Sequence, residues 1–350
     1  MSRFLFFGIF LLFIFVMLAL DLGVFHKKDH EVKMKEAGLW TAIWIVLSMV
    51  LALFIRLKGE WMLGISDNEG LLAYLKEYHL EGIIDATNSF ASNLDLLRKE
   101  LFSQYLAGYF LEESLSIDNI FVMIMIFVSF GIQKEYYHRV LFWGIMGAII
   151  LRFVFIFALG SIVTKFSWVL AIFGVILIWS GIKMFRKKDD ENIDTENHPA
   201  VRFCSKYFRV TPKMDGHNFF TKIDGKKYIT PLFIVLIVIE FSDIIFAVDS
   251  IPAVFSVTTD PFIVYFSNIF AIMGLRSLFF LLSNIKDMFW LLSYGLGALL
   301  TFIGVKMIIA EFLNIHISTG ISLCVILGIL LFSILFSIIF PQKDKEVANQ

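Results

Sequence analysis

The sequence predicts an all-α membrane protein that crosses the bilayer several times. Of its 350 residues, 58% are hydrophobic, 40 are phenylalanine and only 17% are charged, whereas about a quarter of the residues in an ordinary soluble domain are charged. The mean hydropathy is +0.80, so the polar residues are too few to cover a soluble globule. This composition excludes a soluble enzyme, a disordered protein and a nucleic-acid-binding protein. The net charge of −1 also provides no field to attract nucleic acid.

Nine segments are apolar enough to span a membrane. A helix of about 20 apolar residues crosses the hydrocarbon core of a bilayer, and the lipid bilayer is therefore the first predicted partner. The expected spans are residues 4–25, 37–55, 105–130, 139–163, 167–185, 231–255, 262–283, 288–311 and 318–340.

The loop charges predict the orientation of these spans. Most of the Lys and Arg residues outside them lie on the side that holds residues 187–229 and the C-terminal tail. Because basic loops tend to stay in the cytoplasm, we expect an inner-membrane protein with its N-terminus outside and its C-terminus inside the cell.

Two polar segments, 59–104 outside and 187–229 inside, interrupt the spans. In the second, Asp224-Gly225 separates two short β-prone runs and predicts a hairpin with a two-residue type I′ turn. Both segments read either as solvated loops or as surfaces for protein partners. The resulting division is a two-helix region (1–58), an extracytoplasmic segment (59–104), a three-helix unit (105–186), a cytoplasmic loop with the hairpin (187–229), a second three-helix unit (230–311) and a final span with its tail (312–350).

The two three-helix units resemble each other. Asp118 recurs as Asp243, the Ile-Met-Gly that ends at Gly147 recurs at Gly274, and Arg152 recurs as Arg276. Since three spans separate equivalent points, the second unit enters the membrane from the opposite side. This arrangement predicts an inverted repeat, in which secondary transporters place the substrate near the bilayer midplane between the two units.

Ionisable residues lie deep within the repeated spans. Each such charge costs about 2.5–3.5 kcal/mol to insert, so pairing, protonation or a metal ion has to recover that cost. We expect Arg152 and Arg276 to act as charge-pairing partners, but they are outnumbered by the carboxylates around them. A surplus of buried carboxylates is suited to a cation site, and the alternative is a closed set of salt bridges that only fixes helix packing. The acids are Glu112, Glu113, Asp118, Glu240, Asp243 and Asp249.

The available ligand atoms favour a hard divalent cation. Carboxylate, amide and hydroxyl oxygens suit Mn²⁺, Ca²⁺ or Mg²⁺. On a helix Glu112, Ser116 and Asn119 share one face, and so do Glu240 and Asp243. Pro252 either breaks the sixth span and turns Asp249 toward the same cavity or only kinks its end. Cys204 and Cys324 lie far apart in the sequence, which argues against a disulfide framework or a thiolate metal site.

Two long motifs are similar to those of the TerC family of integral membrane proteins, named for tellurite resistance and including alkali-induced Alx-type proteins. One is YFLEESLSIDN at 109–119, and the other lies within 240–277 and includes AVDSIPA at 247–253 and TDPF at 259–262. The resemblance covers nearly the whole chain and implies a nine-span inner-membrane protein associated with Mn²⁺ export and metal homeostasis. It implies metal-site positions at Glu112, Asp118, Asn119, Glu240, Asp243 and Asp249.

We therefore predict a transporter that exports a divalent cation, with Mn²⁺ as the expected substrate and Ca²⁺ as the alternative, coupled to protons. No enzymatic activity and no organic cofactor are expected. A second hypothesis is a membrane scaffold or assembly factor for metal or tellurite resistance, which binds partners through 60–104 and 187–229 and transports nothing. An intramembrane hydrolase is the third, but the sequence has no HExxH motif or Ser/His pair to support it.

Overall fold

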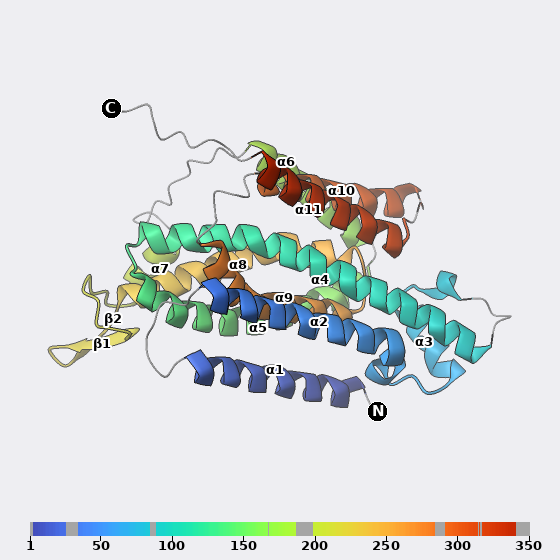
Figure 1. Ribbon diagram of the computed structural model, residues 1–350, viewed down its shortest axis with the longest axis horizontal. Coiled ribbons are helices and arrows are strands. Elements are labelled where there is room, and N and C mark those ends of the chain that lie inside the picture. Colours follow the sequence, from blue (N-terminus) through green and yellow to red (C-terminus); the bar gives the residue numbers. More distant parts are fainter. Residues whose placement is uncertain are drawn as a thin grey trace.

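The computed structural model describes residues 3–25, 34–84, 89–166, 168–186, 199–283, 291–313, 315 and 317–340. Most of these residues form long helices that lie side by side along the longest axis of the molecule (Figure 1). The helices and strands are α1 (Arg3–Phe25), α2 (Met34–Leu63), α3 (Asn68–Glu77), the 3-10 helix η1 (Glu81–Ile83), α4 (Phe90–Ser129), α5 (Lys134–Val163), α6 (Trp168–Arg186), α7 (Pro199–Tyr207), β1 (Phe220–Ile223), β2 (Lys226–Ile229), α8 (Pro231–Phe255), α9 (Pro261–Leu282), α10 (Leu292–Leu313) and α11 (Thr319–Ile339).

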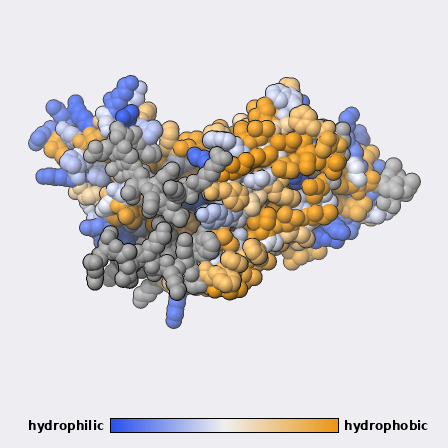
Figure 2. Space-filling view, turned by 90° about the horizontal axis from the view of Figure 1, so that it is seen from above, coloured by the Kyte–Doolittle hydropathy of each residue, from blue (hydrophilic) through white to orange (hydrophobic). Residues whose placement is uncertain are grey.

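Seven helices of the described part of the chain are long and apolar enough to cross a membrane. They are α2, α5, α6, α8, α9, α10 and α11. A broad hydrophobic band covers the middle of the molecule, and hydrophilic side chains gather toward its ends (Figure 2). Helices suit this environment because each backbone N–H and C=O is hydrogen-bonded within the helix and needs no water. The chain is therefore an all-α polytopic membrane protein.

The seven helices differ from the nine predicted spans at α1 and α4. The described apolar part of α1 is Arg3–Ala19, which is shorter than a standard span. Helix α4 carries Glu112, Glu113 and Asp118 close together, and these charges lower its hydropathy. Both helices nevertheless run alongside the others (Figure 1).

Helix α9 lies at the centre of the bundle. Nearly all of its side chains are buried, and it packs against α2, α4 and α5. Helix α8 packs against α4 and α5. The two units predicted from the sequence are thus in contact through α4 and α5 on one side and α8 and α9 on the other.

Helices α6 and α10 pack closely through four glycines. A Cβ atom on Gly174 would lie 2.9 Å from the carbonyl oxygen of Gly304, and one on Gly181 would lie 2.6 Å from that of Gly297. Side chains at these positions would force the two backbones apart, so this contact depends on glycine. The pairing also shows that α6 and α10 run antiparallel.

The polar segments cap opposite ends of the bundle (Figure 1). At one end, Asp67 is the N-cap residue of α3, and its carboxylate accepts a hydrogen bond from the Gly70 amide at 2.8 Å. At the other end, β1 and β2 form an antiparallel hairpin. Its turn residues Asp224 and Gly225 have φ values of 50° and 74°, as a type I′ turn requires. The predicted hairpin is therefore present; residues 187–198 of its loop, and the predicted C-terminal tail from 341, lie outside the described residues.

Two helices extend further into the predicted outer segment than the sequence suggested. Helix α2 continues to Leu63 past non-helical dihedrals at Lys58, and α4 begins at Phe90, well before the predicted span at 105. Glu60 and Arg98 join these extensions through hydrogen bonds of 2.5 and 2.7 Å. Polar residues can continue a helix beyond the membrane because the intrahelical hydrogen bonds do not depend on side-chain hydropathy.

Candidate functional site

A buried polar cluster lies where four helices of the two units meet. Glu112 comes from α4, Arg152 from α5, Asp243 from α8 and Asn268 from α9. The side chains of Arg152, Glu112 and Asp243 are 1%, 0% and 5% exposed, and Asn268 is fully buried. We call these four residues the inner cluster.

Arg152 is the centre of the inner cluster. One terminal nitrogen of its guanidinium donates to Glu112 and, at 2.5 Å, to the amide oxygen of Asn268. The other donates to Asp243 at 3.2 Å. Arg152 thus contacts two buried carboxylates and an amide, and these contacts join all four helices. Burying these charges is costly, and opposite charges at hydrogen-bonding distance offset that cost.

Several oxygens in and beside the inner cluster have no hydrogen-bond partner in the described structure. They include one carboxylate oxygen each of Glu112 and Asp243, and the hydroxyl oxygen of Ser116 one turn along α4. The Nδ2 group of Asn268 also lacks a partner. Buried polar atoms are normally satisfied, and each of these oxygens keeps an unused acceptor position.

The remaining predicted metal ligands take different positions. Asn119 is buried on α4, and Asp118, like the predicted charge-pairing residue Arg276, interacts with another group. The carboxylate of Glu240 lies directly against Gly147 of α5, where a Cβ atom would collide with it. One Glu240 oxygen is buried without a partner.

Asp249 lies on another face of α8. It accepts a hydrogen bond of 2.9 Å from the Ser180 hydroxyl of α6. Helix α8 continues through Pro252 to Phe255, so the helix break that would have turned Asp249 toward the cavity does not occur. Pro252 cannot donate a hydrogen bond to the carbonyl of Val248, yet the helix continues for three residues beyond it.

Within the described residues, no group of three or more His, Cys, Asp or Glu side chains has the geometry to hold a metal ion. The predicted set of six metal ligands therefore stays a prediction. From the sequence, Asn268 either adds a further oxygen to this set or only hydrogen-bonds a neighbouring helix. In the structure its amide oxygen shares Arg152 with the two acids.

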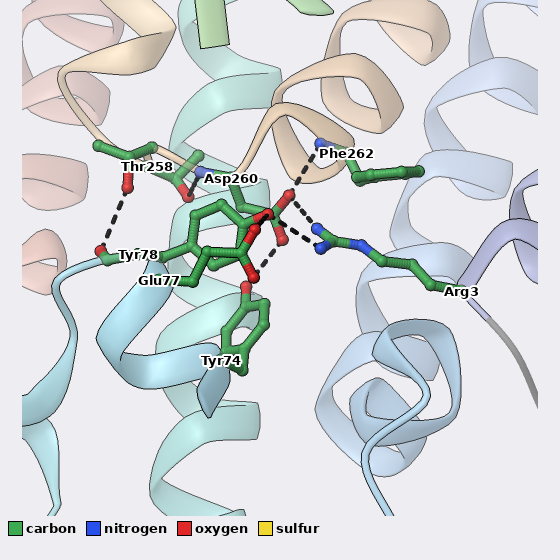
Figure 3. A network of polar contacts seen from close by, with 8 residues as sticks. Arg3, Tyr74, Glu77, Tyr78, Thr258, Asp260 and Phe262 are labelled. Carbon is green, nitrogen blue, oxygen red and sulfur yellow. Dashed lines mark hydrogen bonds and ion pairs between the residues drawn. The ribbon is translucent and has the colours of Figure 1, made fainter. Parts of the chain in front are cut away.

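A second buried cluster lies at the end of the bundle that carries α3 (Figure 3). Asp260 is fully buried and accepts hydrogen bonds from Arg3, from the Tyr74 hydroxyl at 2.8 Å and from the Phe262 amide at 2.9 Å. Arg3 also donates to the Tyr78 hydroxyl at 2.9 Å and lies 4.0 Å from the centre of the Phe262 ring. We call Arg3, Tyr74, Tyr78 and Asp260 the outer cluster.

The outer cluster fixes α1 and α3 to the start of α9. Asp260 is the N-cap residue of α9 and precedes Pro261 in its first turn, which is the usual arrangement at a helix start. Burial raises the pKa of Asp260, although Arg3 and Tyr74 act in the opposite direction. Burial and the nearby Asp260 charge raise the pKa of Tyr74 well above its usual value. No local sequence pattern predicts this cluster, because its residues lie up to 257 positions apart.

Comparison with protein families decides the relationship that the motifs suggested. The model of the integral membrane protein TerC family matches residues 97–345. This chain belongs to the TerC family. The matched region contains all of the inner cluster, whereas Arg3, Tyr74 and Tyr78 of the outer cluster precede it.

Several TerC relatives align along almost the full length of the chain. A membrane protein of Myxococcus xanthus, STKORF319, is 42% identical over 91% of this chain and 87% of its own length. A protein of Photorhabdus laumondii named Alx, described as a candidate membrane-bound redox modulator, is 40% identical over 89% of this chain and 88% of its own. Alx of Escherichia coli K12, with the same description, is 38% identical over 92% and 90%. No solved structure matches this chain.

Proposed function

We propose that this TerC protein exports a divalent cation, with Mn²⁺ as its substrate, through a site between two inverted three-helix units. The observation that carries the proposal is the inner cluster, in which two buried carboxylates and an amide from both units converge on one arginine. One oxygen of each carboxylate remains without a hydrogen-bond partner in the described structure. Such oxygen ligands are those that Mn²⁺ and Ca²⁺ use.

Contacts between the units support the inverted repeat. The Glu240 carboxylate of the second unit lies against Gly147 of the first. Reciprocally, the carboxylate of Glu113 in the first unit would lie 3.9 Å from a Cβ atom on Gly274 of the second. Glu113 and Glu240 are separated in sequence by the same interval as the two glycines. The antiparallel glycine contact of α6 and α10 follows the same symmetry, as expected for alternating access in transporters of this design.

Arg152 has a specific role in the proposed transport cycle. Its guanidinium neutralises Glu112 and Asp243 at the position that an incoming cation would need. Binding of Mn²⁺ displaces the arginine, and the carboxylates return to Arg152 after the ion leaves. Protons compete with the metal for the same carboxylates, so transport is coupled to protons. Asp118, Asn119 and Asp249 then act along the path, on α4 and α8.

In this proposal α1 and α4 also cross the bilayer, which gives nine spans. Helix α4 crosses despite its three acids because Glu112 is fully buried and paired with Arg152, so the charge does not meet lipid. The N-terminus and α3 lie outside the cell, and the hairpin lies in the cytoplasm. Basic residues concentrated around the hairpin support this orientation.

A flux experiment tests the proposal. Proteoliposomes containing the full chain should accumulate Mn²⁺ in response to a pH gradient, more rapidly than Mg²⁺, and Asp243→Asn should reduce the initial rate at least tenfold. The matched control is Asp215→Asn, which neutralises an exposed acid near the hairpin. Unchanged Mn²⁺ flux in Asp243→Asn would reject the inner cluster as the transport site.

A membrane scaffold without transport is the alternative function. A function in thiol redox chemistry has no support from the two cysteines. Cys204 is buried in α7 and Cys324 is exposed on α11, and both are free. The redox description of the Alx relatives would therefore apply here only as an indirect effect of metal export. If the protein is a scaffold, deletion of the hairpin should abolish metal tolerance in cells while Asp118→Asn preserves it.

A further inference from the structure

The α7–hairpin region, residues 199–230, forms an exposed basic surface beside the membrane. It contains seven Lys and Arg residues, all exposed, against only two acids. Large aromatic side chains are exposed among them, including Phe203 at 54% and Tyr207 at 63%. The basic residues are Arg202, Lys206, Arg209, Lys213, Lys222, Lys226 and Lys227.

The hairpin is held close to the start of a membrane-crossing helix. Strand β2 ends at Ile229, and α8 begins at Pro231, so no flexible linker separates them. The Phe220 ring of β1 packs 4.8 Å from that of Phe233 in the first turn of α8. At about 3.3 Å per residue along a strand, Lys227 lies roughly 13 Å from Pro231, which is within reach of the headgroup layer for a long side chain.

The hairpin carries an electrostatically unfavourable pair on one face. Lys222 and Lys227 are directly opposite each other in the strand register, and like charges in this position destabilise a hairpin. Because side chains alternate along a strand, these lysines share a face with Phe220, which contacts α8. The pair therefore lies on the face of the hairpin that adjoins the membrane helix.

We infer that this surface binds anionic phospholipid headgroups of the adjacent leaflet. Phosphate groups neutralise the opposed lysines, and the exposed aromatic residues of α7 enter the headgroup region, where aromatic side chains are commonly found. Attraction between lysines and an anionic leaflet is strong at this distance and is screened by salt. The hairpin thus holds the cytoplasmic end of α8 in register with the membrane surface. This inference is independent of the transported ion.

Hydrogen–deuterium exchange of the full chain in nanodiscs tests it. The amides of β1 and β2 should exchange about a hundredfold more slowly in phosphatidylcholine discs that contain phosphatidylglycerol than in phosphatidylcholine alone, as expected when roughly three lysines gain attraction to an anionic surface. High salt should remove the difference. The combined variant Lys222→Gln, Lys226→Gln, Lys227→Gln should lose it, and the corresponding Arg variant should retain it, which separates loss of charge from loss of folding.

A matched control removes three exposed lysines from the opposite end of the molecule. Lys76→Gln, Lys99→Gln, Lys165→Gln changes the net charge by the same amount and should leave the lipid-dependent protection intact. Equal exchange in both lipids, or equal loss in the control variant, would overturn the inference. Protection that requires a soluble acidic protein and does not depend on lipid charge would also overturn it.

Discussion

The inner and outer clusters each place an arginine among buried acceptors, but they satisfy their polar atoms differently. In the outer cluster, both Asp260 oxygens accept hydrogen bonds, from Arg3, Tyr74 and the Phe262 amide. In the inner cluster, Glu112 and Asp243 each keep one buried oxygen without a partner. The Nε group of Arg3 also lacks a partner among the described residues, so the two clusters differ in their carboxylate acceptors. A carboxylate with both oxygens bonded fixes structure, whereas an unsatisfied oxygen remains available for a ligand. We therefore interpret the outer cluster as a structural contact and the inner cluster as the proposed binding site.

The two clusters also differ in the helices that they join. The inner cluster joins helices of both three-helix units, which have to move relative to each other in the proposed transport cycle. The outer cluster ties α1 and α3 to the start of α9 (Figure 3). We therefore expect substitutions in the inner cluster to affect both transport and stability, and those in the outer cluster to affect mainly stability.

The largest expected effect comes from removing Arg152. Arg152→Gln leaves Glu112 and Asp243 buried beside each other without their cation, a change that typically costs about 3–5 kcal/mol. The unfolding midpoint in detergent should fall sharply, and Mn²⁺ flux should be lost. Neutralising one acid in the double variant Arg152→Gln, Asp243→Asn should restore part of the stability but none of the flux.

Arg3→Gln is the matched substitution in the outer cluster. Asp260 would keep its bonds to Tyr74 and the Phe262 amide, and Arg3 is 17% exposed, so the loss of stability should be smaller and flux should persist. A larger destabilisation by Arg3→Gln than by Arg152→Gln would contradict the distinction between the clusters.

Much of the fold and part of the inner cluster could be predicted from the sequence. The cost of burying Arg152 in lipid requires a carboxylate partner, and the Asp224-Gly225 turn specifies its hairpin locally. Other features depend on tertiary contacts that no local pattern encodes. Ser180 binds Asp249 across two helices, and Arg3 reaches Asp260 from the other end of the chain. The hydropathy pattern marks only the part of a helix that lies in the membrane and not where the helix ends in water. The extensions of α2 and α4 beyond the predicted spans were therefore not predicted.

The next effect concerns the space around the Glu240 carboxylate, which lies against Gly147. An alanine at Gly147 would collide with the Glu240 carboxylate and displace it, which should cost about 1–3 kcal/mol, as overpacking commonly does, and slow Mn²⁺ flux. Gly274→Ala is the control, because its Cβ would lie no closer than 3.8 Å to neighbouring atoms. Equal effects of the two variants on the unfolding midpoint would show that Glu240 is free to move aside.

The smallest expected effect tests the outer cluster through pH. Tyr74→Phe removes the hydrogen bond to Asp260 and should cost about 1 kcal/mol at neutral pH. Because burial raises the pKa of Tyr74, the folded protein keeps this proton after the unfolded chain has lost it. Above the usual tyrosine pKa of about 10, the unfolded state therefore binds fewer protons, and the stability contributed by Tyr74 falls by up to about 1.4 kcal/mol per pH unit. The phenylalanine variant lacks this loss, so the difference between the two unfolding midpoints should narrow as the pH rises above 10. A difference that stays constant or widens over that range would mean that Tyr74 is not held protonated by its burial, and that the outer cluster is looser than its hydrogen bonds indicate.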